Sequence, residues 1–366
     1  MINVTKSFLP DREKFKSYVD KIFDSGWLTN NGENCIELEK RLKEYLGVEN
    51  LLLVSNGTLA LQIAYKVLGL TGEVITTPFS FVATTSSLVW EGLQPTFVDI
   101  DKDYLTIDSA KIEEAITPRT SAIVATHVYG NACEIDLIDK IAKKHKLKVI
   151  YDAAHAFGTK YKDSSILNFG DASVISFHST KIFHTVEGGA IVFKDPEMLK
   201  KARRAINFGI VSQTEIQDLG INSKLNEFQA AMGLCVLDEI DGVISRRGER
   251  YEYYMEYLNN VENVGFPKGN SFSTNNFSHF PVLFESEEVL LRVVKKLNEN
   301  DIYPRRYFYP SLETLPYLSK RQVMIVSSDV SKRILCLPLY DSLEREIQHK
   351  ILEIIKENVA ISGSFI

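Results

Sequence analysis

Short apolar runs alternate with helical patterns along the first two thirds of this chain. Seven runs rich in β-branched residues are typical of buried strands, and they begin at Leu51, Glu73, Pro95, Ser121, Leu147, Ser173 and Ala190. Between the first two runs, apolar residues recur at helical spacing from Ala60 to Leu68. This alternation predicts an α/β fold with a mostly parallel, seven-stranded sheet covered by helices on both faces.

The pattern changes after the charged stretch that begins at Ser245. Longer loops and isolated strands follow, so we expect a large domain over residues 1–245 and a smaller α+β domain over residues 246–366. We also expect the N-terminal segment to pack on the small domain. The chain end reads as one helix, in which Asp341 and Glu344 have the spacing of a capping box before Ile347.

Composition excludes several classes of protein. The 366 residues include 45% hydrophobic ones, and their net charge of −6 comes from interspersed acids and bases, which argues against nucleic-acid or membrane binding. No signal peptide or membrane span is evident, so a cytoplasmic location is expected. The four cysteines form no metal-binding pattern, and we expect free thiols and no metal site at Cys35, Cys133, Cys235 and Cys336.

A first candidate site is the segment SNGTLAL, which follows an apolar strand and opens a helix. The backbone amides of Gly57 and Thr58 would point outward from this helix start, which is a favourable phosphate site. An ordinary turn capped by Ser55 or Asn56 gives the same pattern. The segment lacks the glycine spacings of dinucleotide-binding sites and P-loops, which argues against both.

Two further candidates come at the ends of later strands. Asp152 ends the run KVIYD, and residues at the carboxyl ends of parallel strands line the ligand crevice of such sheets. A carboxylate there can keep a pyridine nitrogen protonated, although it can also simply cap the next turn. His155, three residues later, could stack on a flat ring or be an ordinary packed histidine.

Lys181 lies in SFHSTK, shortly after another strand. A lysine in such a loop is most often exposed and inert, but its surroundings change that interpretation. Ser176 precedes it, and Gly188 and Gly189 follow it, which suggests that the backbone passes close to something bulky. A partly desolvated lysine has a lowered pKa and can form a Schiff base and shuttle protons.

Together these segments resemble the DegT/StrS family of sugar-nucleotide aminotransferases, which are fold-type-I enzymes that use pyridoxal 5'-phosphate (PLP). The resemblance covers nearly the whole chain. It is carried by the segments WLTNNGENCIELEKRLKEYLG, SNGTLAL, TPFSFVATTSSLVWEGLQPTFVDID, HVYGNACEID, VIYDAAHAFG, SFHSTKIFHTVEGGA, GINSKLNEFQAAMG, YFYPSL and ILCLPLYDSL.

The resemblance implies a role for each matching residue. Lys181 would be the catalytic residue, which forms the Schiff base with the cofactor and then moves the proton between substrate and cofactor carbons. The other implied cofactor contacts are Asp152 at the pyridine nitrogen, Gly57, Thr58 and Ser176 at the phosphate, Phe81 and His155 at the ring, and Asn222 reaching the phosphate from the partner subunit of a homodimer with shared sites. Substrate contacts are implied for His184, Glu187, Arg305, Arg306 and Tyr307.

The implied reaction moves an amino group from L-glutamate to a ketosugar on a nucleoside diphosphate, while the cofactor alternates between PLP and its pyridoxamine form. Lysine at position 181 favours this reaction over the dehydration that family members with histidine perform. The segments TTPFSFVATTSSLVWEGLQPTFVDID and HVYGNACEID are most similar to those of members that aminate C4 of dTDP-4-keto-6-deoxy-D-glucose. The product of that reaction is dTDP-4-amino-4,6-dideoxy-D-glucose, which is used for bacterial O-antigen.

Several alternatives remain open from the sequence. Within the family, the substrate could be a 3-ketosugar or a GDP- or UDP-linked 4-ketosugar. Outside it, the chain could be a different PLP enzyme, such as an amino-acid lyase or a carbocyclic aminotransferase, or a noncatalytic nucleotide-sugar sensor. The presence of both Lys181 and Asp152 disfavours the sensor.

Overall fold

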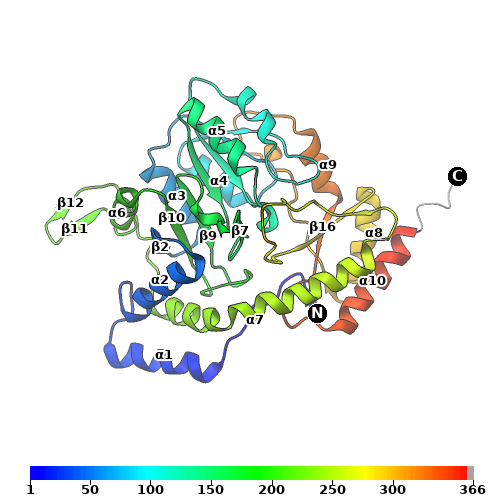
Figure 1. The fold of residues 1–366 in the computed structure, drawn as a ribbon, viewed down its shortest axis with the longest axis horizontal. Helices are drawn as coiled ribbons and strands as arrows, with labels where there is room; N and C mark the ends of the chain where they lie inside the picture. Colours follow the sequence, from blue (N-terminus) through cyan, green and yellow to red (C-terminus); the bar gives the residue numbers. More distant parts are fainter. Residues whose placement is uncertain (361–366) are drawn as a thin grey trace.

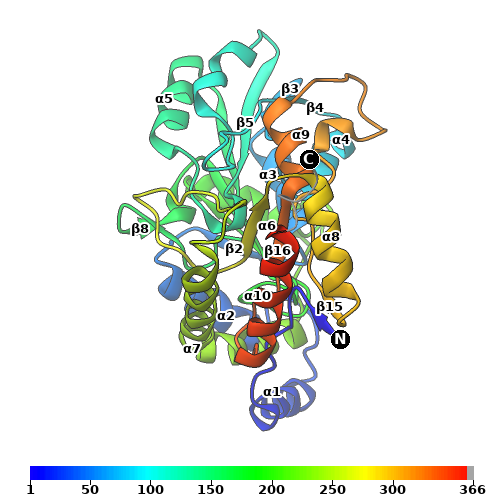
Figure 2. The same ribbon diagram turned by 90° about the vertical axis from the view of Figure 1, so that its right-hand side faces the viewer.

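A seven-stranded sheet forms the centre of the molecule in the computed structural model, which describes residues 1–360 (Figures 1 and 2). All seven expected strands are confirmed, and the strand order is β2-β10-β9-β6-β5-β3-β4. Only β10 runs antiparallel to its neighbours in this sheet. The strands are β2 (Leu51–Val54), β3 (Glu73–Thr76), β4 (Gln94–Phe97), β5 (Thr120–Thr126), β6 (Lys148–Asp152), β9 (Ala172–Ser176) and β10 (Gly189–Phe193).

Helices cover both faces of this sheet, because side chains alternate along each strand and both sets are apolar. In β2, Leu51 and Leu53 pack into one core cluster, whereas Leu52 and Val54 pack into the other. The covering helices are α2 (Glu33–Leu46), α3 (Gly57–Val67), α4 (Val82–Trp90), α5 (Ile135–His145) and α6 (Pro196–Ala205). The predicted α/β class is therefore confirmed, and we call this part the large lobe.

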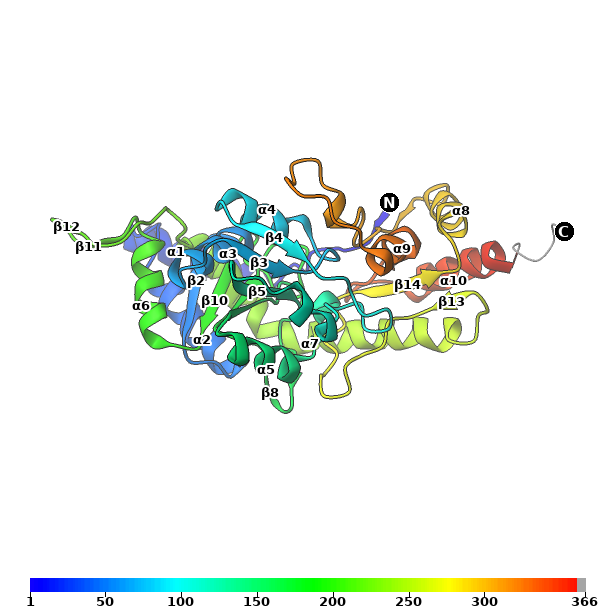
Figure 3. The same ribbon diagram turned by 90° about the horizontal axis from the view of Figure 1, so that it is seen from above.

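One long helix, α7 (Glu227–Leu258), joins the large lobe to a small lobe (Figures 1 and 3). The small lobe packs three strands against three helices. These elements are β13 (Val264–Gly265), β14 (Phe280–Phe284), β16 (Ile334–Leu337), α8 (Glu287–Asn298), α9 (Ile325–Arg333) and α10 (Arg345–Val359). The expected boundary at residue 245 falls inside α7, which contributes Ile240 to one core and Tyr254 to the other.

The N-terminal segment touches both lobes. Its first strand, β1 (Ile2–Asn3), pairs in parallel with β15 (Ile302–Tyr303) of the small lobe, and the following α1 (Arg12–Ser25) packs on α7. The chain therefore starts at the small lobe before it builds the large one.

The capping box expected before the last helix is wrong. Helix α10 begins at Arg345, and Glu344 occupies its N-cap position without a side-chain hydrogen bond to the helix. Asp341 instead faces α7 and forms an ion pair with Arg246 at 3.3 Å. Asp341 has the spacing of a capping residue, but its carboxylate pairs with Arg246 of α7 instead of capping α10.

A short hairpin projects from one end of the large lobe (Figure 3). It consists of β11 (Ile210–Ser212) and β12 (Glu215–Ile216), and a second small hairpin is formed by β7 (Lys160–Tyr161) and β8 (Ser164–Ser165). The projecting hairpin and its flanks expose six large apolar side chains, namely Phe208, Ile210, Val211, Ile216, Leu219 and Ile221.

Candidate active site

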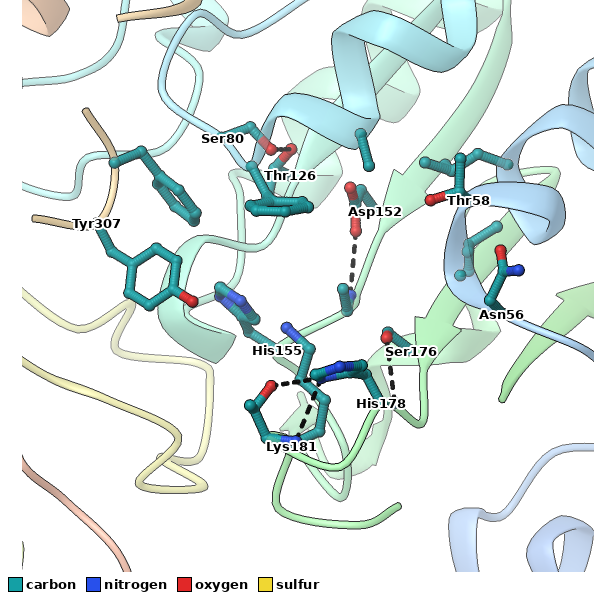
Figure 4. A pocket seen from close by; sticks show the side chains of 18 of the residues that line it. Asn56, Thr58, Ser80, Thr126, Asp152, His155, Ser176, His178, Lys181 and Tyr307 are labelled. Carbon is teal, nitrogen blue, oxygen red and sulfur yellow. Dashed lines mark hydrogen bonds between the residues drawn. The ribbon is translucent and has the colours of Figure 1, made fainter. Parts of the chain in front are cut away.

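A cavity of about 250 Å³ lies at the carboxyl ends of the central strands, where the small lobe meets the large one. Such strand ends are the usual ligand crevice of parallel sheets. Ten residues that the sequence singled out line this cavity, namely Gly57, Thr58, Phe81, Asp152, His155, Ser176, Lys181, Glu187, Arg305 and Tyr307. Figure 4 shows the side chains of Lys181, Asp152 and His155 converging on the same space.

Lys181 lies on the loop between the antiparallel neighbours β9 and β10, and its amide donates to the carbonyl of His178 at 2.9 Å. Burial lowers the pKa of the Lys181 amine to about 8, assisted by the positive charge of Arg305 and opposed by the carboxylate of Asp152. A lysine in this state has a sizeable uncharged fraction near neutral pH and can act as a nucleophile.

The close approach inferred from the paired glycines is present. A Cβ on Gly189 would lie 2.9 Å from the carbonyl carbon of Asn56 and 2.9 Å from the carbonyl oxygen of Ile175. A side chain at this position would therefore push the end of the lysine loop away from the start of α3. Glycine allows the two segments to pack backbone against backbone.

The start of α3 forms one wall of the cavity. The Asn56 side chain caps the helix by accepting from the Leu59 amide at 2.9 Å, so the amides of Gly57 and Thr58 remain without intrahelical acceptors. A Cβ on Gly57 would lie 3.1 Å from the Cβ of Ser176, which explains how the end of β9 fits beside the helix start. Two amides and two hydroxyls thus gather where a phosphate group could bind.

Asp152 ends β6 and is almost fully buried. One carboxylate oxygen accepts from the Ala154 amide at 3.1 Å, and the other accepts from the Thr84 hydroxyl at 2.7 Å. Burial raises the pKa of Asp152, while the bonds from Thr84 and Ala154 and the nearby Lys181 act in the opposite direction. Neither oxygen is saturated by these bonds, since each carboxylate oxygen has two lone pairs.

Aromatic rings form another wall, to which His155 and Phe308 contribute. Their rings lie nearly parallel to each other and to the ring of Tyr129, with interplanar angles of 3° to 6°. Burial and the charge of Lys181 hold the pKa of His155 well below its ordinary value, so its imidazole is neutral. Within residues 1–360, its Nδ1 atom has no hydrogen-bond partner. A neutral, flat surface of this kind suits an aromatic ligand ring.

Side chains from outside the expected motifs hold these walls. Asn276, on a small-lobe loop, donates to the carbonyls of His155 at 2.7 Å and Phe157 at 3.0 Å. The buried Arg247 of α7 donates to the carbonyl of Ser278 at 2.7 Å and thereby fixes the same loop. Neither residue could be identified from the sequence, because neither belongs to a local motif.

Two expected substrate contacts lie elsewhere in the structure. His184 does not line the cavity, because its imidazole is bonded to the carbonyl of Phe8 at 2.7 Å and to the amide of Val186 at 3.3 Å. Arg306 is also absent from the cavity wall. Its guanidinium pairs with Glu287 at 2.6 Å and lies over the ring of Tyr309.

Asn222 is exposed and does not line the cavity of its own chain. It forms an isolated backbone bridge with Asn207 near the projecting hairpin. This position leaves its side chain accessible from outside the chain.

Residues 1–360 contain neither a candidate metal site nor a candidate membrane span. No group of three or more histidine, cysteine or acidic side chains among residues 1–360 could hold a metal ion. None of the described helices combines the length and the apolar character needed to span a bilayer. The four cysteines are buried and unpaired.

Comparisons with known proteins agree with this geometry. The sequence profile of the DegT/DnrJ/EryC1/StrS aminotransferase family matches residues 10–356. The chain is 45% identical to dTDP-4-amino-4,6-dideoxy-D-glucose transaminase of Shigella dysenteriae, covering 97% of this chain and 98% of that protein. It is 40% identical to the protein of the same name from Escherichia coli, over 97% and 98% of the two chains.

A solved structure is similar over nearly the whole chain. The crystal structure of DesI, determined in the presence of its TDP-sugar product, superposes with a TM-score of 0.92 at 31% identity, covering 99% of this chain and 95% of DesI. The chain therefore belongs to the DegT/DnrJ/EryC1/StrS aminotransferase family. It is a PLP-dependent sugar aminotransferase, and the predicted family, cofactor and enzyme class are confirmed.

Proposed function

From this family membership we propose that the chain transfers the amino group of L-glutamate to C4 of dTDP-4-keto-6-deoxy-D-glucose and so forms dTDP-4-amino-4,6-dideoxy-D-glucose. The observation that carries the proposal is the similarity to two transaminases named for this product, at 45% and 40% identity over 97% of the chain. We further propose that the product serves O-antigen synthesis in the cytoplasm, where four free thiols would stay reduced.

The residues that line the cavity fit PLP. The amides of Gly57 and Thr58 with the hydroxyl of Ser176 would bind its phosphate, and Asp152 would pair with its pyridine nitrogen. Phe81 and His155 would lie against its ring. When bound, the cofactor supplies an electron sink that stabilises negative charge on the substrate carbon.

Lys181 is proposed as the proton carrier. Its amine has a pKa of about 8, so the uncharged Nζ can accept the proton from the substrate carbon that bears nitrogen. The charged amine can then return a proton to a neighbouring carbon. The neutral imidazole of His155 does not compete for this proton, because burial holds its pKa far below neutrality.

Arg305 is proposed as the contact for anionic substrate groups. Its guanidinium lines the cavity, lies 4.3 Å from the ring of Tyr307 and has no carboxylate partner within residues 1–360. Both proposed substrates carry anionic groups, a carboxylate in glutamate and a diphosphate in the nucleotide sugar. A planar guanidinium binds either group through paired hydrogen bonds.

Glu187 and Tyr307 are proposed as further substrate contacts. Both line the cavity, and Glu187 faces His178 across the lysine loop at 3.5 Å. The carboxylate of Glu187 is exposed and can accept a hydrogen bond from a sugar hydroxyl.

Absorption spectroscopy tests the reaction. Protein loaded with PLP should show a visible band that L-glutamate bleaches, and Lys181→Ala should show no such band without added amine. Half-reactions with dTDP-, UDP- and GDP-linked ketosugars should restore the band fastest with the dTDP-linked 4-ketosugar. Restoration with a 3-ketosugar alone would contradict the C4 assignment.

We also propose a homodimer in which Asn222 reaches the cofactor phosphate of the partner subunit. Its exposed position and the apolar surface of the adjacent hairpin support this proposal. Mixing and exchanging Asn222→Ala and Lys181→Ala subunits should restore part of the activity. Dimers that regain none after exchange would contradict shared sites.

A further inference from the structure

A chain of three buried hydroxyls ends at Asp152. The Thr126 hydroxyl donates to Ser80 at 3.0 Å, Ser80 and Thr84 lie 2.7 Å apart, and Thr84 donates to Asp152 at 2.7 Å. The hydroxyls come from the end of β5, the loop after β3 and the first turn of α4, which lie side by side because β5 pairs with both β3 and β6. Figure 4 shows the bond between Ser80 and Thr126 beside Asp152.

The hydrogen bonds in this chain have one direction. Because an ionised carboxylate only accepts, Thr84 must give its single proton to Asp152, and its oxygen then accepts from Ser80. The Ser80 oxygen in turn accepts from Thr126. A protonated Asp152 that donated to Thr84 would reverse these bonds and release the Thr126 proton from its bond to Ser80.

We propose that Thr84 is a positioning residue of the active site: backed by Ser80 and Thr126, it holds Asp152 in the ionised form and fixes one of its oxygens, so that the carboxylate is ready to pair with a pyridinium nitrogen. The second half of this inference rests on the proposed role of Asp152 toward PLP. The first half concerns the cofactor-free protein alone.

Other groups around Asp152 do not replace this effect. Lys181, across the cavity, favours the ionised carboxylate, but its amine is the group that must lose its charge for the reaction. Tyr65 of α3 faces the same region, and burial raises its pKa, so that it remains an uncharged phenol. Thr84 is thus a constant donor whose effect does not change with the state of Lys181.

The chain offers a matched control at the next residue. Thr84 and Thr85 are both fully buried in α4, but the Thr85 hydroxyl has no hydrogen-bond partner within residues 1–360. Valine has nearly the same shape as threonine. Thr84→Val and Thr85→Val therefore remove the same atom from adjacent positions, and only the first removes a bond to Asp152.

The decisive measurement is the pKa of Asp152 in cofactor-free protein, by ¹³C NMR of protein labelled at the aspartate carboxyl carbon, with Asp152→Asn to assign the signal. Loss of one hydrogen bond to a charged acceptor should raise this pKa by about one unit in Thr84→Val. Thr84→Ser should retain the original value, Ser80→Ala should give a smaller rise, and Thr85→Val should give none.

Affinity for PLP provides the second readout, measured by fluorescence quenching. Thr84→Val should weaken binding by about tenfold, because loss of one hydrogen bond to a charged acceptor leaves the pairing carboxylate less firmly positioned. An unchanged Asp152 pKa in folded Thr84→Val, or an equal rise in Thr85→Val, would overturn the proposal. A raised pKa with unchanged PLP affinity would retain the hydroxyl effect but refute the role of Asp152 toward the cofactor.

Discussion

Substitution of Asn276 by alanine is expected to loosen the active site from a residue outside every recognisable motif. The Asn276 side chain is buried and makes three hydrogen bonds. It donates to the carbonyls of His155 and Phe157, and it accepts from the Ser278 amide at 3.1 Å. These bonds attach the backbone beneath the His155 ring to the small lobe.

The size of the effect follows from these bonds. Each neutral hydrogen bond contributes about 1 kcal/mol, and alanine leaves two buried carbonyls and one buried amide without partners. Asn276→Ala should therefore lower the free energy of unfolding by about 3 kcal/mol. The adjacent Asn275 is exposed, and its side chain accepts from the Phe277 amide at 2.8 Å and bonds to Tyr251, so Asn275→Ala should cost about 1 kcal/mol because exposed bonds are replaced by bonds to water.

Urea unfolding of both variants, followed by circular dichroism and extrapolated to water, measures this difference. PLP affinity should fall several-fold in Asn276→Ala and stay near the original value in Asn275→Ala, because only the former releases His155. If the two variants lost equal stability, or if folded Asn276→Ala bound PLP normally, the argument from these bonds would be refuted.

Three further predictions follow from the same geometry. Capture of PLP by cofactor-free protein should accelerate about tenfold per pH unit and level off near pH 8, since burial lowers the pKa of Lys181 to about 8; a rate that still rises between pH 9 and 10 would contradict this. Arg305→Met should raise the KM for both substrates at least about tenfold, with partial recovery in Arg305→Lys, through loss of a charged contact; unchanged KM values would exclude the proposed anion contact. Glu227→Gln should lower the free energy of unfolding by about 1–2 kcal/mol, because this buried carboxylate accepts hydrogen bonds from two backbone amides at the start of α2. The exposed Glu33→Gln variant should change that free energy by less than about 0.5 kcal/mol, and urea titration compares the two variants.

The sheet and the residues at the carboxyl ends of its strands could be predicted from the sequence, because both have a local pattern. Strands buried on both faces must be apolar throughout, so the seven runs were visible, and polar residues just beyond them, such as Asp152, had to lie at one edge of the sheet. The helix start at Gly57 was visible because strand-to-helix turns have a local pattern.

Side-chain directions could not be predicted in the same way. His184 lies on the lysine loop, yet its imidazole is taken by a carbonyl 176 positions away at Phe8. Asn276 is 121 positions from His155, and an asparagine in a loop has no feature that would identify such a contact. The hydroxyls behind Asp152 are common residue types whose function appears only when three strands and a helix are assembled.

The continuous helix α7 has a consequence for engineering. Its 32 residues form a rod about 48 Å long, and both hydrophobic cores are built partly on it. A chimera that exchanges the small lobe for that of a relative should therefore be joined inside α7, between Val243 of one core and Tyr254 of the other, with the helix kept continuous. It should also carry the donor's first residues, because the opening strand pairs with β15. The first residues of the chain and the small lobe should thus be exchanged together.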